Sequence, residues 1–174
     1  SLTLIPNQHL MADSSADMVI VTPKIFLTQA IQIATGHEQH DGLKINIVHP
    51  DDLYREFSSG RRDLVAIRDY LRMLYHRRTP QSSTGPSLKY LLLLGSTSYD
   101  ALNVLPGNMN HVPTFQSYNS RDPLGSYCSD AFFGLMDSTE GAFGDGSGDR
   151  MDLGIGRIPV RDAGQAAAMV RKIQ

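Results

Sequence analysis

The chain has 174 residues, of which 41% are hydrophobic and 20% are charged, and its net charge is −2 at pH 7. This composition fits one folded domain with a single core, and the near-neutral charge argues against a general nucleic-acid binder. No apolar run approaches the roughly 20 residues that span a bilayer, and the start lacks the pattern of a signal peptide, so we expect neither in the chain.

The first half alternates predicted strands with predicted helices. Apolar runs rich in β-branched residues or leucine predict strands at 17–22, 43–48 and 89–94. Apolar residues at helical spacing predict a helix at 23–37. Pro50 and the two acidic residues after it predict the start of a short helix at 50–57. Alternation of this kind predicts an α/β fold, a three-layer doubly wound and mostly parallel sheet with the first strand between the other two.

Two helix starts and one helix face are predicted from local signals. Thr22 followed by Pro23 predicts an N-cap and a first helical residue, and Asp63 predicts the cap of a third helix. Apolar residues follow Asp63 at intervals of three and four, which predicts a core stripe of Leu64, Ile67, Leu71 and Leu74. Arg68 and Arg72 fall off this stripe, so we interpret them as a solvated face, with a surface for an anionic partner as the alternative.

The second half is rich in glycine and proline and is predicted to consist mainly of loops. Short extended pieces are expected at 112–115 and 131–136, and a further strand at 151–158. Asp162 opens a final predicted helix, and Gln165 completes a capping-box pattern.

Three further features have both a functional and a purely structural interpretation. The turn 95–98 follows a buried strand and could hold a phosphate, although it lacks the phosphate-loop spacing of glycines. His37 and His40 could share a metal, but no third ligand is evident and a polar helix end explains them. Cys128 is the only cysteine, so no intrachain disulfide can form; its nearest histidine in sequence is His111, and a small buried side chain is the alternative to a nucleophile.

An acidic loop is the best candidate for a metal site. It contains Asp145, Asp149 and Asp152 on a glycine-rich backbone, and such hard oxygen ligands suit calcium. The spacing is not that of an EF-hand, and a solvated hairpin tip is the alternative. We refer below to these three aspartates as the acidic loop.

Several segments, taken in order, resemble the gingipain-like cysteine peptidases, and most closely their sortase-like subgroup from the type IX secretion system. Their order and spacing carry the resemblance, which extends over about 17–174. The matching segments are 53–60, 66–68, 88–95, 98–100, 112–114, 126–130, 154–160 and 172–173.

The resemblance implies a caspase-like catalytic domain built from two α/β subdomains. Residues 17–174 would form the first, flavodoxin-like subdomain and residues 1–16 an N-terminal extension, in which Ser1 and Leu2 are consistent with a cloning scar. In the family a His-Gly pair and a later cysteine in the second subdomain form the catalytic dyad. No His-Gly occurs here, so the resemblance implies that the chain holds no catalytic residue and ends before the catalytic subdomain, and that Cys128 is not the nucleophile.

The family also binds calcium in this subdomain. The corresponding positions here are Asp149 and Asp152, while Ser96 stands at a strand end where the family often has aspartate. Calcium at the acidic loop is therefore the one cofactor that we expect.

The implied parent protein removes the C-terminal signal from secreted cargo. Its expected partners are the second subdomain, the cargo and other secretion-system components, without nucleic acid and without membrane insertion by this segment. The expected location is the outer membrane, the cell surface or the periplasm. The alternatives are a non-enzymatic flavodoxin-like module that binds a ligand at 95–98, and a protein-interaction domain that uses the arginine-rich helix.

Overall fold

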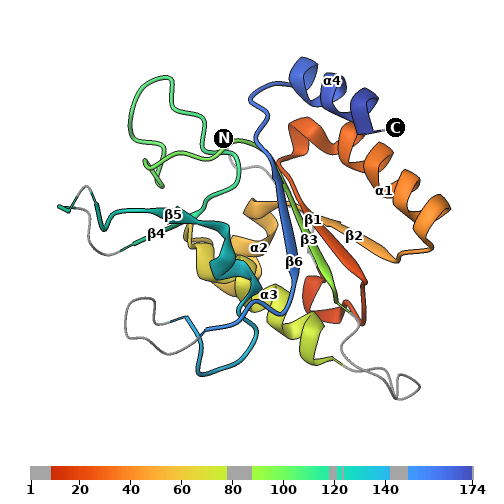
Figure 1. Ribbon diagram of the computed structural model, residues 1–174, viewed down its shortest axis with the longest axis horizontal. Coiled ribbons are helices and arrows are strands. Elements are labelled where there is room, and N and C mark those ends of the chain that lie inside the picture. The colour runs from red at the N-terminus through yellow and green to blue at the C-terminus, as the bar shows by residue number, and fades with distance from the viewer. Residues whose placement is uncertain (1–8, 78–87, 118–120, 123, 142–148, 174) are drawn as a thin grey trace, which may run out of the picture.

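Four parallel strands form the centre of the fold (Figure 1). In this computed structural model, which describes residues 9–77, 88–117, 121–122, 124–141 and 149–173, the strand order is β2–β1–β3–β6. The strands are β1 (Met18–Val21), β2 (Ile45–Val48), β3 (Tyr90–Leu94) and β6 (Gly154–Ile158). The predicted parallel sheet, with the first strand between the second and third, is confirmed.

Helices cover both faces of the sheet and give the predicted three layers (Figure 1). One layer consists of α1 (Leu27–Asp41), which follows a 3-10 turn at Lys24–Phe26, and α4 (Ala163–Ile173). The other consists of α2 (Pro50–Phe57) and α3 (Leu64–His76). In the described residues, no helix has the length and apolar character needed to cross a membrane.

The central strand β1 separates two hydrophobic clusters. Val19 and Val21 belong to the cluster beneath α2 and α3, while Met18 and Ile20 belong to the cluster beneath α1 and α4. All four side chains are buried, which explains why β1 reads as a continuous apolar run rather than an alternating one.

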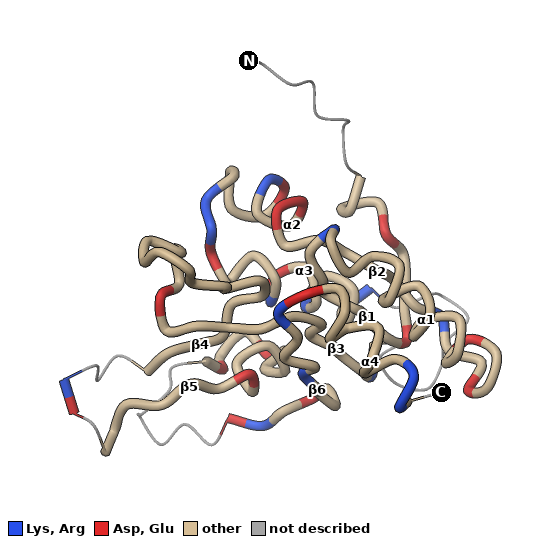
Figure 2. The backbone as a smooth tube through the Cα atoms, turned by 90° about the horizontal axis from the view of Figure 1, so that it is seen from above, with Lys and Arg blue, Asp and Glu red and all other residues tan. Residues whose placement is uncertain are grey.

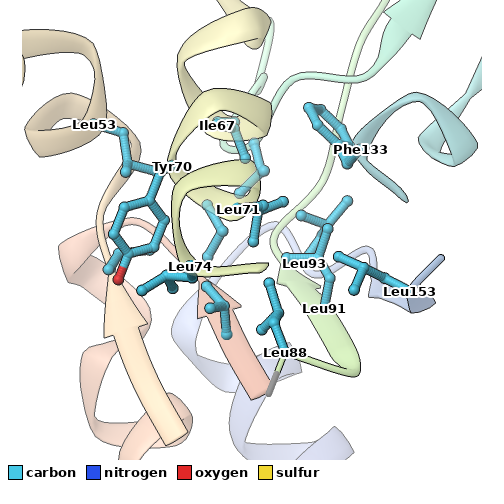
Figure 3. Close-up of a cluster of buried hydrophobic side chains, with 14 of the residues drawn as sticks. Leu53, Ile67, Tyr70, Leu71, Leu74, Leu88, Leu91, Leu93, Phe133 and Leu153 are labelled. Atoms are coloured by element: carbon cyan, nitrogen blue, oxygen red, sulfur yellow. The ribbon is translucent and has the colours of Figure 1, made fainter. Parts of the chain in front are cut away.

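Helix α3 provides the largest part of the first cluster, as Figure 3 shows. Asp63 caps it, because its side chain accepts a hydrogen bond from the Val65 N–H at 2.9 Å. Ile67, Leu71 and Leu74 are fully buried, so the predicted core stripe is confirmed for these three residues.

The two arginines of α3 were wrongly predicted to form a solvated face. Arg68 lies 4.0 Å from the centre of the Phe132 ring, and Arg72 donates hydrogen bonds to the carbonyls of Leu135 and Asp137. Both side chains therefore attach the loop-rich second half to the helix. Figure 2 also shows acidic and basic residues interspersed along the backbone.

Helix α1 starts later and ends later than predicted. The Thr22 hydroxyl does not cap it but donates to the Leu94 carbonyl at 3.0 Å, which links β1 to the end of β3. The helix continues to Asp41 and ends at Gly42, whose φ of 66° is a left-handed conformation that glycine adopts without strain.

The second half contains a small antiparallel pair and a 3-10 helix where an extended piece was predicted. Strand β4 (Phe115–Gln116) pairs with β5 (Cys128–Ser129). Residues 131–136 were predicted to be extended, but Asp130–Gly134 forms a 3-10 helix. An extended chain would turn adjacent side chains to opposite sides, whereas this turn buries both Phe132 and Phe133 in the same cluster.

The described part of the N-terminal segment packs on α2 and α3. The Glu56 carboxylate accepts hydrogen bonds from the N–H groups of Leu10 and Met11, and Ala16 is buried. The Tyr70 hydroxyl donates to Asp13 at 2.7 Å. Burial is the main reason why the pKa of Tyr70 is raised above its ordinary value.

Candidate functional site

A cleft of about 670 Å³ lies where β3 and β6 end. Ligands of open parallel sheets usually bind beyond the carboxyl ends of the strands, so this is the expected place for a site. The segment after β3, the loop that follows it, strand β5 and the start of α4 all contribute. Its lining residues include Thr97, Ser98, Tyr99, Met109, Thr114, Cys128, Arg161 and Asp162.

The turn at Gly95 requires glycine for two reasons. Its φ is 147°, which side chains rarely allow, and an added Cβ would lie 2.9 Å from the His111 Cβ. The Gly95 N–H donates to the Ile158 carbonyl and the Ser96 N–H donates to the Val160 carbonyl. The chain after β3 is thus held tightly against the end of β6.

The polar groups of this turn are already used within the protein. The Ser96 hydroxyl donates to the Met109 carbonyl at 2.8 Å, and the Thr97 hydroxyl lies 3.4 Å from the side-chain oxygen of Asn110. The Ser98 hydroxyl accepts the N–H of Asp100. Since the first two N–H groups of the turn are also bonded, these contacts argue against the phosphate cradle considered from sequence.

The Arg157 guanidinium is the centre of the hydrogen-bond network at this edge. It donates to both carboxylate oxygens of Asp130 at 2.7 Å each, and its side chain is only 11% exposed. It also donates to three carbonyls, which belong to Gly95, Val112 and Pro113. Each of these bonds reaches another segment, so one side chain holds the separate loops together.

Four of the segments that carried the family resemblance meet at Arg157. They are 88–95, 112–114, 126–130 and 154–160. Sequence reasoning did not single out this arginine. One signal in the sequence could have found it, namely an arginine inside a predicted strand. A charged side chain that is buried there needs a carboxylate or carbonyl partner.

The loop after the turn is shaped by its own side chains. The Asp100 carboxylate accepts the Leu105 N–H at 2.7 Å and the Asn108 side-chain amide at 3.0 Å. These bonds, led by that from Leu105, lower the pKa of Asp100. Asn103 takes a left-handed φ of 56° and accepts hydrogen bonds from the Asn108 side chain and the Asn110 N–H.

Cys128 lies exposed in β5 and lines the cleft. No histidine is among the described residues that line this cleft. The His111 ring packs edge-on against Phe26, and its Nε2 lies 3.1 Å from the Arg161 carbonyl. In the described part of the chain, nothing in the cleft thus supplies a histidine base to the thiol. The sequence alternative of a small buried cysteine is wrong, because the residue is exposed.

The acidic loop falls only partly within the described residues, since Asp145 lies outside them. The Asp149 carboxylate accepts the Gly141 N–H at 3.2 Å, and the Asp152 carboxylate accepts the Met136 N–H at 3.1 Å. Carboxylate oxygens are ligands that calcium prefers. The described residues contain no group of three or more acidic, histidine or cysteine side chains placed to hold a metal, and the Ser96 hydroxyl bonds to a carbonyl. Calcium binding therefore stays a prediction.

The two histidines of α1 fit the helix-end interpretation. His37 Nδ1 lies 2.6 Å from the Asp41 carboxylate, one turn further along the same helix. This contact gives the His37 ring a partner other than a metal.

Comparisons with known proteins relate this chain to a peptidase family and to a solved structure. The model of peptidase family C25 matches residues 11–174. Among solved structures, the crystal structure of dimeric latent PorU from Porphyromonas gingivalis is similar, with 30% sequence identity and a TM-score of 0.81. The match covers 97% of this chain and 16% of that chain, so this chain spans a small part of that protein's length. No curated protein matches the sequence.

Proposed function

The chain belongs to peptidase family C25, and from this membership we propose that it is the first subdomain of a cysteine endopeptidase or sortase of type IX secretion. The proposed parent enzyme removes the C-terminal signal from secreted cargo. The observation that carries the proposal is the similarity to PorU at 30% identity over nearly the whole chain.

In this proposal the chain provides scaffold and part of the substrate cleft, and the second subdomain provides the catalytic histidine and cysteine. A thiolate there attacks the carbonyl that precedes the signal, the peptide C–N bond breaks, and histidine protonates the leaving amine. Water or an amine acceptor then attacks the thioester and releases the thiol. The network around Arg157 supports a scaffold role, because its hydrogen bonds link the separate segments at the sheet edge.

The proposed partners follow from this chemistry. They are the second subdomain, the secreted cargo and other components of the secretion system, with no nucleic acid and no membrane insertion by this segment. The proposed location is the outer membrane, the cell surface or the periplasm.

The decisive experiment compares two cysteine substitutions in the longest natural protein that contains this chain. We expect a downstream cysteine, preceded by a His-Gly pair, whose replacement by alanine abolishes removal of the cargo signal. Cys128→Ala is the matched control and should not abolish cargo processing, because no histidine lines its cleft among the described residues. The isolated chain should show no peptidase activity. Loss of processing in Cys128→Ala, with processing retained in the downstream variant, would contradict the proposal.

A further inference from the structure

Most of the charged side chains around the cleft have hydrogen-bond partners within the protein. Asp100 accepts hydrogen bonds from its own loop, Asp130 is paired with Arg157, and Asp162 accepts the Gln165 N–H at 2.8 Å. Arg161 also lines the cleft, and in the described part of the chain its guanidinium makes no hydrogen bond or ion pair. The cleft lining therefore contains one cation, Arg161, that has no ion-pair partner among the described residues, and one carboxylate, Asp162, which is bonded to a backbone N–H.

Side chains with large apolar surfaces line the same cleft as Arg161. Tyr99 and Met109 line the same cleft and are 74% and 48% exposed. They belong to the loop that Asp100 and Asn103 brace through hydrogen bonds, so the loop is held in shape before a ligand arrives. A preorganised apolar surface binds at a lower entropic cost than a loop that must first become ordered.

We propose that this cleft binds an extended segment of the polypeptide substrate, with an acidic side chain on Arg161 and adjacent apolar side chains on Tyr99 and Met109. The inference rests on the proposed function, because it specifies which substrate segments that enzyme would prefer. Charge complementarity selects the acidic residue, and the exposed tyrosine and methionine select its apolar neighbours. A carboxylate is favoured over a phosphate because the hydroxyls and N–H groups of the 95–98 turn are largely bonded within the protein.

The test uses this chain labelled with ¹⁵N and two blocked peptides that differ at one position. The peptides are Gly-Val-Leu-Glu-Val-Ser and Gly-Val-Leu-Gln-Val-Ser, and amide shifts in the NMR spectrum report both affinity and position. We expect the Glu peptide to bind about 3- to 10-fold more tightly, the range for a partly exposed charge-assisted pair, with shifts at Thr97, Tyr99 and Arg161.

Four substitutions distinguish a specific contact in the cleft from a general effect of the protein's net charge. Arg161→Gln should remove the preference for the Glu peptide, and Arg161→Lys should retain part of it. Arg171→Gln, an exposed change at the other end of α4, removes the same charge and should leave the preference intact. Tyr99→Ala should weaken both peptides equally.

Three outcomes would overturn the inference. They are equal affinity for the two peptides, a preference that survives Arg161→Gln, and inorganic phosphate that shifts the same amides while neither peptide does. Since these measurements need no catalytic subdomain, their failure is distinct from failure of the proposed function, which the cargo-processing experiment tests separately.

Discussion

Replacing Arg157 should destabilise the chain far more than replacing an exposed arginine. In Arg157→Gln the Asp130 carboxylate loses both charged donors, and three loop carbonyls lose theirs. Removing one partner of a buried ion pair costs about 3–5 kcal/mol. The Asp130 side chain is 24% exposed and keeps its bond from the Thr114 hydroxyl, so we expect a loss of about 3 kcal/mol, at the lower end of that range.

Urea unfolding at pH 7, followed by circular dichroism, measures this loss. With a denaturant dependence of about 2 kcal/mol per molar, a loss of about 3 kcal/mol lowers the midpoint by about 1.5 M. Arg157→Lys keeps the charge without the planar fork, and its loss should be intermediate. The matched control is Arg55→Gln, which removes an arginine that is 36% exposed and donates one hydrogen bond, to Asp52 of the same helix, and it should cost less than about 1 kcal/mol. Equal losses for Arg157→Gln and Arg55→Gln would refute the argument that Arg157 holds the loops together.

Three further predictions concern α3, the loop and calcium. Leu71→Ala should lower the free energy of unfolding in urea melts by about 2–5 kcal/mol. Arg72→Ala should lower it by about 1–3 kcal/mol, because loop carbonyls lose a charged donor. A negligible effect of Arg72→Ala would show that those hydrogen bonds do not stabilise the fold. The pKa of Asp100 is lowered from 3.8, so its ionised form stabilises the fold above that pH and this contribution is lost as the pH falls through the folded pKa. Melts of Asp100→Asn should therefore lose less stability than the parent chain between pH 5 and about pH 3, and an identical pH dependence would contradict this role. Calcium should raise the melting temperature through the acidic loop, because binding to the native state alone must stabilise it; calorimetry without any shift at millimolar calcium would remove the site.

The regular core was predictable from sequence because its signals are local. The apolar runs of β1 and β3 and the spacing of Ile67, Leu71 and Leu74 each need only neighbouring residues to be read. The order of the first three strands followed from general rules of chain connection.

Contacts between distant segments were not predictable in the same way. Arg68 and Arg72 have the spacing of a solvated helix face. Their contacts with Phe132 and Leu135 depend on where the second half of the chain folds, which the sequence of the helix does not reveal. Thr22 had the pattern of a cap, but the end of β3 offered its hydroxyl a carbonyl instead. The Arg157 network joins residues up to 62 positions apart, and no local pattern encodes its geometry.

The place of β6 at the edge of the sheet has a consequence for the order of folding. Strands β1, β2 and β3 come from the first part of the chain, and each can pair as soon as it has been synthesised. Strand β6 follows the 95–153 segment, so it can pair with β3 only after the other three strands have been synthesised. Because Arg157 arrives with β6, the loops at the carboxyl edge stay unlinked during synthesis until this last strand adds. A nascent chain halted before β6 should therefore show the early sheet as protected from protease while the 96–117 region is still cleaved.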